Sequence, residues 1–200
     1  MLQKTHSSVS RQGTKVIQPS RMSAGERGLL QFAIIDDEDR LLHIACSKGT
    51  LLRELLRKYH CEACGTTNNL EDLRHARQTL PDSDIIYAQP DEIPWRDESF
   101  SVIMCNAAYN QVDDPGKMLE ESMRVLKPGG QILIALTWYP TPIAGVINYF
   151  TGQAGTESPI YCYSKQEAIA SLEAMGFESV TWHSNELGSS VVIGWKPKYQ

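Results

Sequence analysis

The order in which short apolar stretches alternate with amphipathic ones is the feature that most constrains what this chain can fold into. Five short apolar stretches, at 41–45, 61–66, 84–88, 100–105 and 131–137, read as buried strands. Most of them are separated by segments whose apolar residues recur at helical spacing, as in the stretch from Thr50 to Tyr59. Regular alternation of strand and helix predicts a parallel sheet covered by helices.

Both ends of this pattern extend it. Ser23-Ala24-Gly25-Glu26 and Ser164-Lys165-Gln166-Glu167 have capping-box spacing, so each is expected to open a helix, the first running to about residue 35. Two last strands, near 177–183 and 189–195, resemble a hairpin. We therefore predict an α/β, doubly wound, Rossmann-like fold. Its seven-stranded sheet is expected to be mostly parallel, with an antiparallel C-terminal edge strand and helices on both faces.

Length and composition favour one domain over residues 1–200, since 200 residues with 42% hydrophobic content suffice for one core. Residues 1–22 are expected to form a polar N-terminal tail. The stretch 138–163 is long for a connection and rich in aromatic residues, so we expect a lid-like insertion over the site. Its aromatic side chains either line an acceptor pocket or pack on the sheet.

Charge and hydropathy argue against two classes of partner. A net charge of -5 is unlike that of proteins that grip nucleic acid through phosphate contacts, so no nucleic acid is expected. The longest apolar run, Ile132 to Leu136, is far shorter than a membrane span, so no membrane partner is expected either. The N-terminal decapeptide lacks an apolar signal stretch, which favours a cytoplasmic protein. The oligomeric state is left open.

The cysteines fit a reduced protein. Their number, 5, is odd, which argues against a framework of paired disulfides. Cys61 and Cys64 have the spacing of a metal-binding pair, but a structural zinc site usually needs four ligands and the chain offers no second pair. We expect both thiols to be small core residues and predict no metal.

Two motifs carry a resemblance to a known family. The first is Ile93-Pro94-Trp95-Arg96-Asp97-Glu98-Ser99-Phe100, which leads into the fourth expected strand. The second is Arg124-Val125-Leu126-Lys127-Pro128-Gly129-Gly130, which precedes the fifth. In these motifs and their spacing the chain resembles the class I S-adenosylmethionine-dependent methyltransferases of type 11. The resemblance implies S-adenosylmethionine as cofactor and S-adenosylhomocysteine as product.

The family's glycine-rich first loop, close to D-x-G-x-G-x-G, corresponds here to His43-Ile44-Ala45-Cys46-Ser47-Lys48-Gly49. Only Gly49 keeps the glycine, while Ala45 and Ser47 are small and His43 stands where an acid is usual. Because glycine lets the backbone approach a ligand closely, each added side chain narrows the loop's options. The resemblance implies that His43, Ala45, Ser47 and Gly49 contact the cofactor.

Further implied cofactor contacts follow the second and third strands. The carboxylate that takes the ribose hydroxyls in the family corresponds to Thr67, with Asn68 next. The acid that commonly meets the adenine amino group is replaced by Gln89, followed by Pro90 and Asp91. Hydrogen bonds to neutral groups are weaker than those to charged ones, so cofactor affinity is expected to fall roughly tenfold or more.

The remaining candidates follow the fourth and fifth strands. Cys105 and Asn106 end the fourth strand, where the resemblance implies cofactor contact; Cys105 is alternatively an edge residue only. Candidates for the acceptor pocket lie just beyond the two strands: Tyr109, Asn110, Trp138 and Tyr139.

Two functions remain open from the sequence. The first is methyl transfer to a small molecule, which requires alignment of the acceptor more than a dedicated catalytic residue. No catalytic residue is therefore assigned, although Tyr109, Tyr139 or His43 could accept a proton from the acceptor. The alternative is a binding or regulatory protein that has lost productive cofactor chemistry. A nicotinamide-binding dehydrogenase is disfavoured because the first loop lacks the G-x-G-x-x-G arrangement.

Overall fold

A computed structural model describes residues 22–106, 112, 114–137, 163–184 and 189–198. Its helices are α1 Ala24–Phe32, α2 Thr50–Lys58, α3 Leu70–Thr79, α4 Pro115–Val125 and α6 Lys165–Ala174. Its strands are β1 Arg40–Ile44, β2 Glu62–Thr67, β3 Ile85–Tyr87, β4 Phe100–Asn106, β5 Leu126–Thr137, β6 Glu178–Ser184 and β7 Ser189–Trp195.

The described strands form one seven-stranded sheet in the order β3-β2-β1-β4-β5-β7-β6. Strands β1 to β5 are parallel, and β7 pairs antiparallel with both β5 and β6. This confirms the predicted fold class, with one refinement: β7 lies inside the sheet, and β6 is the edge strand, antiparallel to its neighbour. The strand order reverses between β1 and β4, which makes the crevice beyond their carboxyl ends the expected ligand site.

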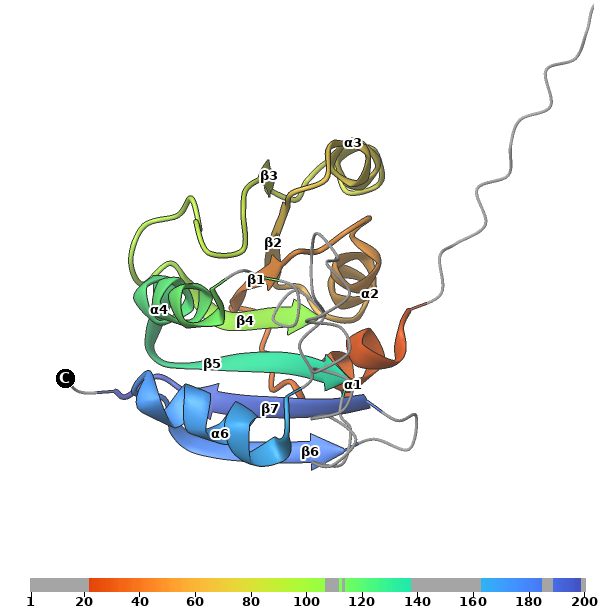
Figure 1. The fold of residues 1–200 in the computed structure, drawn as a ribbon. Helices are drawn as coiled ribbons and strands as arrows, with labels where there is room; N and C mark the ends of the chain where they lie inside the picture. The colour runs from red at the N-terminus through yellow and green to blue at the C-terminus, as the bar shows by residue number, and fades with distance from the viewer. Residues whose placement is uncertain (1–21, 107–111, 113, 138–162, 185–188, 199–200) are drawn as a thin grey trace, which may run out of the picture.

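Helices cover both faces of the sheet (Figure 1). Leu29 of α1, Leu51 of α2 and Leu73 of α3 belong to one buried cluster on the first face. Met118 of α4 and Leu172 of α6 belong to a second cluster on the opposite face. Helix α1 lies at the carboxyl ends of β4 and β5, beside the switch point (Figure 1). The strands β1, β4 and β7 are thus buried on both sides, whereas the edge strand β6 is largely exposed.

The helix starts follow the capping residues of the sequence. The hydroxyl of Ser23 accepts a hydrogen bond from the Glu26 amide, and the Glu26 carboxylate accepts one from the Ser23 amide. Ser164 and Glu167 repeat this reciprocal pair at the start of α6. Both capping boxes predicted from sequence are confirmed.

Two boundaries differ from expectation. Helix α1 ends at Phe32 rather than near residue 35, because Ala33 already has extended backbone (φ -71°, ψ 137°). Strand β5 begins at Leu126 rather than residue 131: Leu126 pairs with Phe100, and the register shifts before the pairing of Gln131 with Val102. The Lys-Pro-Gly-Gly turn is therefore an irregularity within β5, not a separate turn before it. No helix of the described ranges is long and apolar enough to cross a membrane.

Candidate functional site

The loop that follows β1 keeps a glycine-like backbone although two of its three small residues are not glycine. Ala45, Ser47 and Gly49 have φ angles of 53°, 48° and 75°. Left-handed backbone costs an L-residue about 1–2 kcal/mol, and such strain is concentrated at functional sites. The loop therefore has left-handed backbone at every second residue, at the three positions where the family pattern has glycine.

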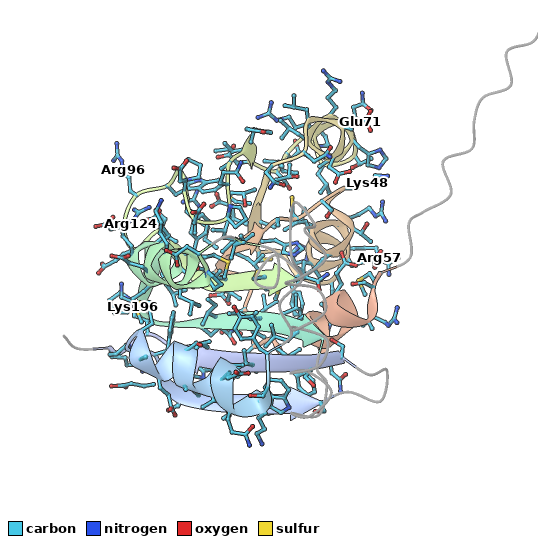
Figure 2. All side chains as sticks on the ribbon, in the orientation of Figure 1. Lys48, Arg57, Glu71, Arg96, Arg124 and Lys196 are labelled. Carbon is cyan, nitrogen blue, oxygen red and sulfur yellow. The ribbon has the colours of Figure 1, made fainter. Side chains whose placement is uncertain are left out.

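Hydrogen bonds to β2 hold this loop in place. The amide of Ala45 donates to Thr66 Oγ1 at 3.2 Å, and the amide of Cys46 donates to the Thr66 carbonyl at 2.7 Å. The Cys46 side chain is buried above Gly65, where an added Cβ would lie 2.8 Å from Cys46 Sγ. Burial raises the pKa of the Cys46 thiol to about 12, so the thiol is a packing group. Lys48 is exposed on the side of α2 (Figure 2).

Gly49 has a packing role of its own. It is the N-cap of α2, and a Cβ on it would lie 2.7 Å from Leu80 Cδ1. Its positive φ and this close approach both favour glycine. The glycine thus allows α2 and the end of α3 to pack together, a requirement that is independent of any ligand.

His43 lies in the core rather than in the crevice. Its side chain is 1% exposed, and neither Nδ1 nor Nε2 has a hydrogen-bond partner in the described structure. On β1 it pairs with Gly65 of β2 and Met104 of β4. Burial lowers its pKa to about 4, so the ring is neutral at pH 7. A neutral buried imidazole differs from the acid usual at this position, and it does not reach a ligand as a base.

Two exposed amides meet at the carboxyl ends of β2 and β3. Asn68 Nδ2 donates to Gln89 Oε1 at 3.2 Å. Thr67, the position of the ribose carboxylate in the family, is buried, and its Oγ1 accepts a hydrogen bond from the Asn69 amide at 3.3 Å. The polar groups presented to solvent at these strand ends are therefore the two neutral amides.

Asp91 does not replace the missing acid beside these amides. Its carboxylate lies 3.8 Å from Lys117 Nζ of α4 and lines a cleft of about 520 Å³ with Tyr87 and Glu121. Pro90, just before it, is buried. This cleft flanks the end of β3 on the side of α4.

At the end of β4 the structure separates two candidates. Cys105 is fully buried, and its Sγ lies 4.0 Å from Met118 Sδ of α4, so the side chain belongs to the core. This supports the alternative that Cys105 only borders the site. Asn106 is partly exposed, and its Nδ2 donates to Ser23 Oγ at 3.2 Å.

Sequence reasoning missed the part that α1 plays here. A Cβ on Gly25 would lie 2.2 Å from Asn106 Oδ1 and 3.2 Å from the Ala135 Cβ of β5. The first turn of α1 therefore rests directly on the ends of β4 and β5. The sequence signal for this contact was Gly25 itself. Glycine has a low helix propensity, so a glycine in the first turn of a helix indicates that another element packs closely against it. The described residues do not include the four candidates for the acceptor pocket, Tyr109, Asn110, Trp138 and Tyr139. They also leave out most of the expected N-terminal tail and of the lid-like insertion.

Comparison with known proteins agrees with this geometry. Residues 42–134 match the model of a methyltransferase domain family. A ubiquinone/menaquinone biosynthesis C-methyltransferase from Idiomarina loihiensis is 32% identical over 183 residues, covering 77% of this chain and 72% of that protein. The chain belongs to the class I S-adenosylmethionine-dependent methyltransferases. It spans about half or less of two other curated relatives, 47% of an uncharacterized Methanocaldococcus jannaschii protein and 43% of a Renibacterium salmoninarum demethylmenaquinone methyltransferase.

Solved structures share the fold of this methyltransferase-family chain. A putative methyltransferase solved in complex with the Haloferax volcanii Trm112 methyltransferase activator gives a TM-score of 0.74 at 19% identity, covering 86% of this chain and 88% of that one. Phosphoethanolamine N-methyltransferase 2 of Haemonchus contortus, in complex with S-adenosylmethionine, gives 0.71 at 13% identity, covering 86% and 52%.

The residues at the strand ends fit the cofactor that this family implies. The β1 loop has the left-handed backbone that brings amides close to a ligand, and Asn68 and Gln89 offer groups that can bond hydroxyl and amino groups. The donor set is neutral where the family commonly has acids. The described strand ends thus combine a left-handed β1 loop with polar groups that are neutral where the family commonly has acids.

Proposed function

We propose that this chain transfers a methyl group from S-adenosylmethionine to a small-molecule acceptor and releases S-adenosylhomocysteine. The observation that carries the proposal is the β1 loop, where Ala45 and Ser47 hold positive φ despite their side chains. Glu98 and Ser179 also have positive φ, but among the described residues only the β1 loop places such residues at alternate positions, and it does so beside the switch point of the sheet. The chain's family membership supports the same reaction.

The chemistry places modest demands on the protein. The cofactor supplies an activated methyl on a sulfonium, a good leaving group, so the reaction is an in-line displacement. Alignment of the reactants can contribute about 7–11 kcal/mol to such a step. The chain's own residues would bind and orient: the β1 loop by its backbone, Asn68 and Gln89 by their amides, and Asn106 by fixing α1 at the end of β4. The buried His43 is not proposed as a base.

A small-molecule acceptor is the class that the relatives support. The names of the relatives reported above refer to methylation in ubiquinone and menaquinone biosynthesis and of phosphoethanolamine. The net charge of -5 disfavours a nucleic-acid acceptor. The acceptor itself is not assigned.

A second function is favoured by one specific observation. Thr67 and Gln89 are neutral, and Asp91, the first carboxylate after Gln89 in the sequence, is paired with Lys117. A domain that binds another ligand in this crevice, without methyl transfer, would have the same neutral strand ends. The two functions differ in whether the unaltered chain binds the cofactor.

Two variants of the chain distinguish methyl transfer from binding of another ligand. Thermal shifts with S-adenosylhomocysteine would be measured on the wild type, on Ser47→Gly, and on Ser47→Gly combined with Thr67→Asp. The proposal expects a shift for the wild type and an affinity gain of roughly tenfold when the carboxylate is added. Ser47→Gly alone separates the effect of the loop from that of the acid. A shift confined to the Thr67→Asp variant would favour the binding protein and contradict the proposal.

A further inference from the structure

The bridge between Asn68 and Gln89 is a preorganised polar element at the outer part of the crevice. Both side chains are exposed, and their mutual hydrogen bond is 3.2 Å long. Their backbones are fixed by neighbouring bonds. The Ala88 amide donates to the Thr67 carbonyl at 3.1 Å, and the Glu92 amide donates to the Gln89 carbonyl at 3.1 Å. The two amides are thus held at the ends of adjacent strands.

The position of the bridge indicates which part of a ligand it meets. Strands β2 and β3 lie farther from the switch point than β1 does. In nucleotide-binding α/β sheets the ribose is bound at the end of the second strand, past the first loop. A nucleoside that extends from the β1 loop across β2 therefore directs its base toward Gln89 at the end of β3.

The bridge differs chemically from a carboxylate at the same place. The mutual bond uses one N–H of Asn68 and one lone pair of Gln89 Oε1. For a ligand, Asn68 still offers one N–H and its oxygen, and Gln89 offers two N–H groups and one lone pair. An amide therefore both donates and accepts, whereas an ionised carboxylate only accepts. Asp91 does not join the bridge, since it is paired with Lys117 at 3.8 Å.

We propose that the Asn68–Gln89 bridge binds the edge of the cofactor's nucleobase and accepts adenine and hypoxanthine alike. The inference rests on the proposed function. On its Watson–Crick edge adenine presents the N6 amino donor beside the N1 acceptor, and a side-chain amide can pair with both groups. On the same edge hypoxanthine reverses this order, with the O6 keto oxygen beside N1–H. If both amides of the bridge turn by half a rotation, their mutual hydrogen bond is kept in the opposite sense and the matching groups face the base, whereas a carboxylate repels the keto oxygen.

The test compares two ligands by calorimetric titration: S-adenosylhomocysteine and S-inosylhomocysteine, which differ in the base alone. The wild type is expected to bind both with Kd values within about tenfold of each other. Gln89→Glu is expected to prefer the adenine form by more than about thirtyfold. Gln78→Glu makes the same change at an exposed site on α3 and is expected to keep the wild-type ratio.

The outcomes that would overturn the inference also show whether the proposed function fails with it. If the wild type binds S-adenosylhomocysteine but prefers it by more than about tenfold, the base-reading inference is wrong and the proposed function stands. The same holds if Gln89→Glu keeps the wild-type ratio. If neither ligand binds the wild type, the proposed function fails and the inference fails with it.

Discussion

Arg124 Nη1 lies 2.8 Å from Asp97 Oδ1, and this contact joins the two motifs on which the family resemblance rests. The same guanidinium donates to the carbonyls of Trp95 at 2.9 Å and Ile93 at 3.0 Å. Glu121 holds it from the other side at 2.7 and 2.8 Å. The pKa of Glu121 is lowered chiefly by its hydrogen bonds from Arg124. The two stretches are therefore one structural unit that fixes the approach to β4.

We expect Arg124→Met to lower the free energy of unfolding by about 1–3 kcal/mol, because two backbone carbonyls and Glu121 lose their donor. Urea denaturation would measure the change. Arg96→Met, on the same side of the molecule (Figure 2), removes an exposed arginine and should change stability by less than about 0.5 kcal/mol. Equal losses in the two variants would contradict the role given to Arg124.

The strain in the β1 loop can be tested with a single type of substitution. Ala45→Gly relieves a φ of 53° and is expected to stabilise the fold by about 0.5–1 kcal/mol. Ala170→Gly, at an exposed position in α6, should destabilise it by about 1 kcal/mol. Thermal and urea unfolding would report both values. A loss of about 1 kcal/mol in both variants would show that Ala45 is not strained.

Replacing a helical glycine with alanine usually stabilises a helix, but the contact between α1 and β4 predicts the opposite effect at Gly25. Gly25→Ala should destabilise the fold by about 1–3 kcal/mol, because the new Cβ would lie 2.2 Å from Asn106 Oδ1. Gly116→Ala in α4, where the nearest atom is 3.2 Å away at Asp114, should be neutral or stabilising. Combining Gly25→Ala with Asn106→Ala should restore much of the loss. A stabilised single Gly25→Ala variant would mean that α1 does not rest on Asn106.

His43 predicts a pH dependence of stability. Its pKa is about 4 in the folded chain, below the ordinary value of 6.5, so the unfolded chain binds a proton more readily. The stabilisation is fully present above pH 6.5 and is lost as the pH falls toward 4. The loss should reach about 3 kcal/mol relative to His43→Met, which cannot titrate. Urea unfolding of both proteins at several pH values would measure it; parallel curves would contradict the assignment.

Most of the fold could be predicted from the sequence because local signals agreed with one another. Apolar runs marked the strands, and the Ser23 and Ser164 capping boxes marked two helix starts. The position of β7 between β5 and β6 could not be predicted, because strand pairing is set by long-range packing rather than local pattern. The early start of β5 was missed because Pro128 and the glycines after it are typical of a turn.

The site was less predictable. The strand ends were placed correctly, but the burial of each side chain there depends on tertiary packing around the sheet. Both faces of β1 and β4 are covered, which buries His43 and Cys105, whereas Asn68 and Gln89 lie just beyond the ends of β2 and β3 and stay exposed. The pairing of Asp91 with Lys117 joins segments far apart in the chain, which no local pattern shows.

Calorimetric titration of the purified wild-type chain with S-adenosylhomocysteine tests the central claim most directly. We predict saturable binding to one site with a Kd of about 1–100 μM, because the left-handed β1 loop lets amides approach the ligand while the other polar groups are neutral. Absence of heat and of any thermal stabilisation at millimolar ligand would contradict it, and the crevice would then belong to a different ligand.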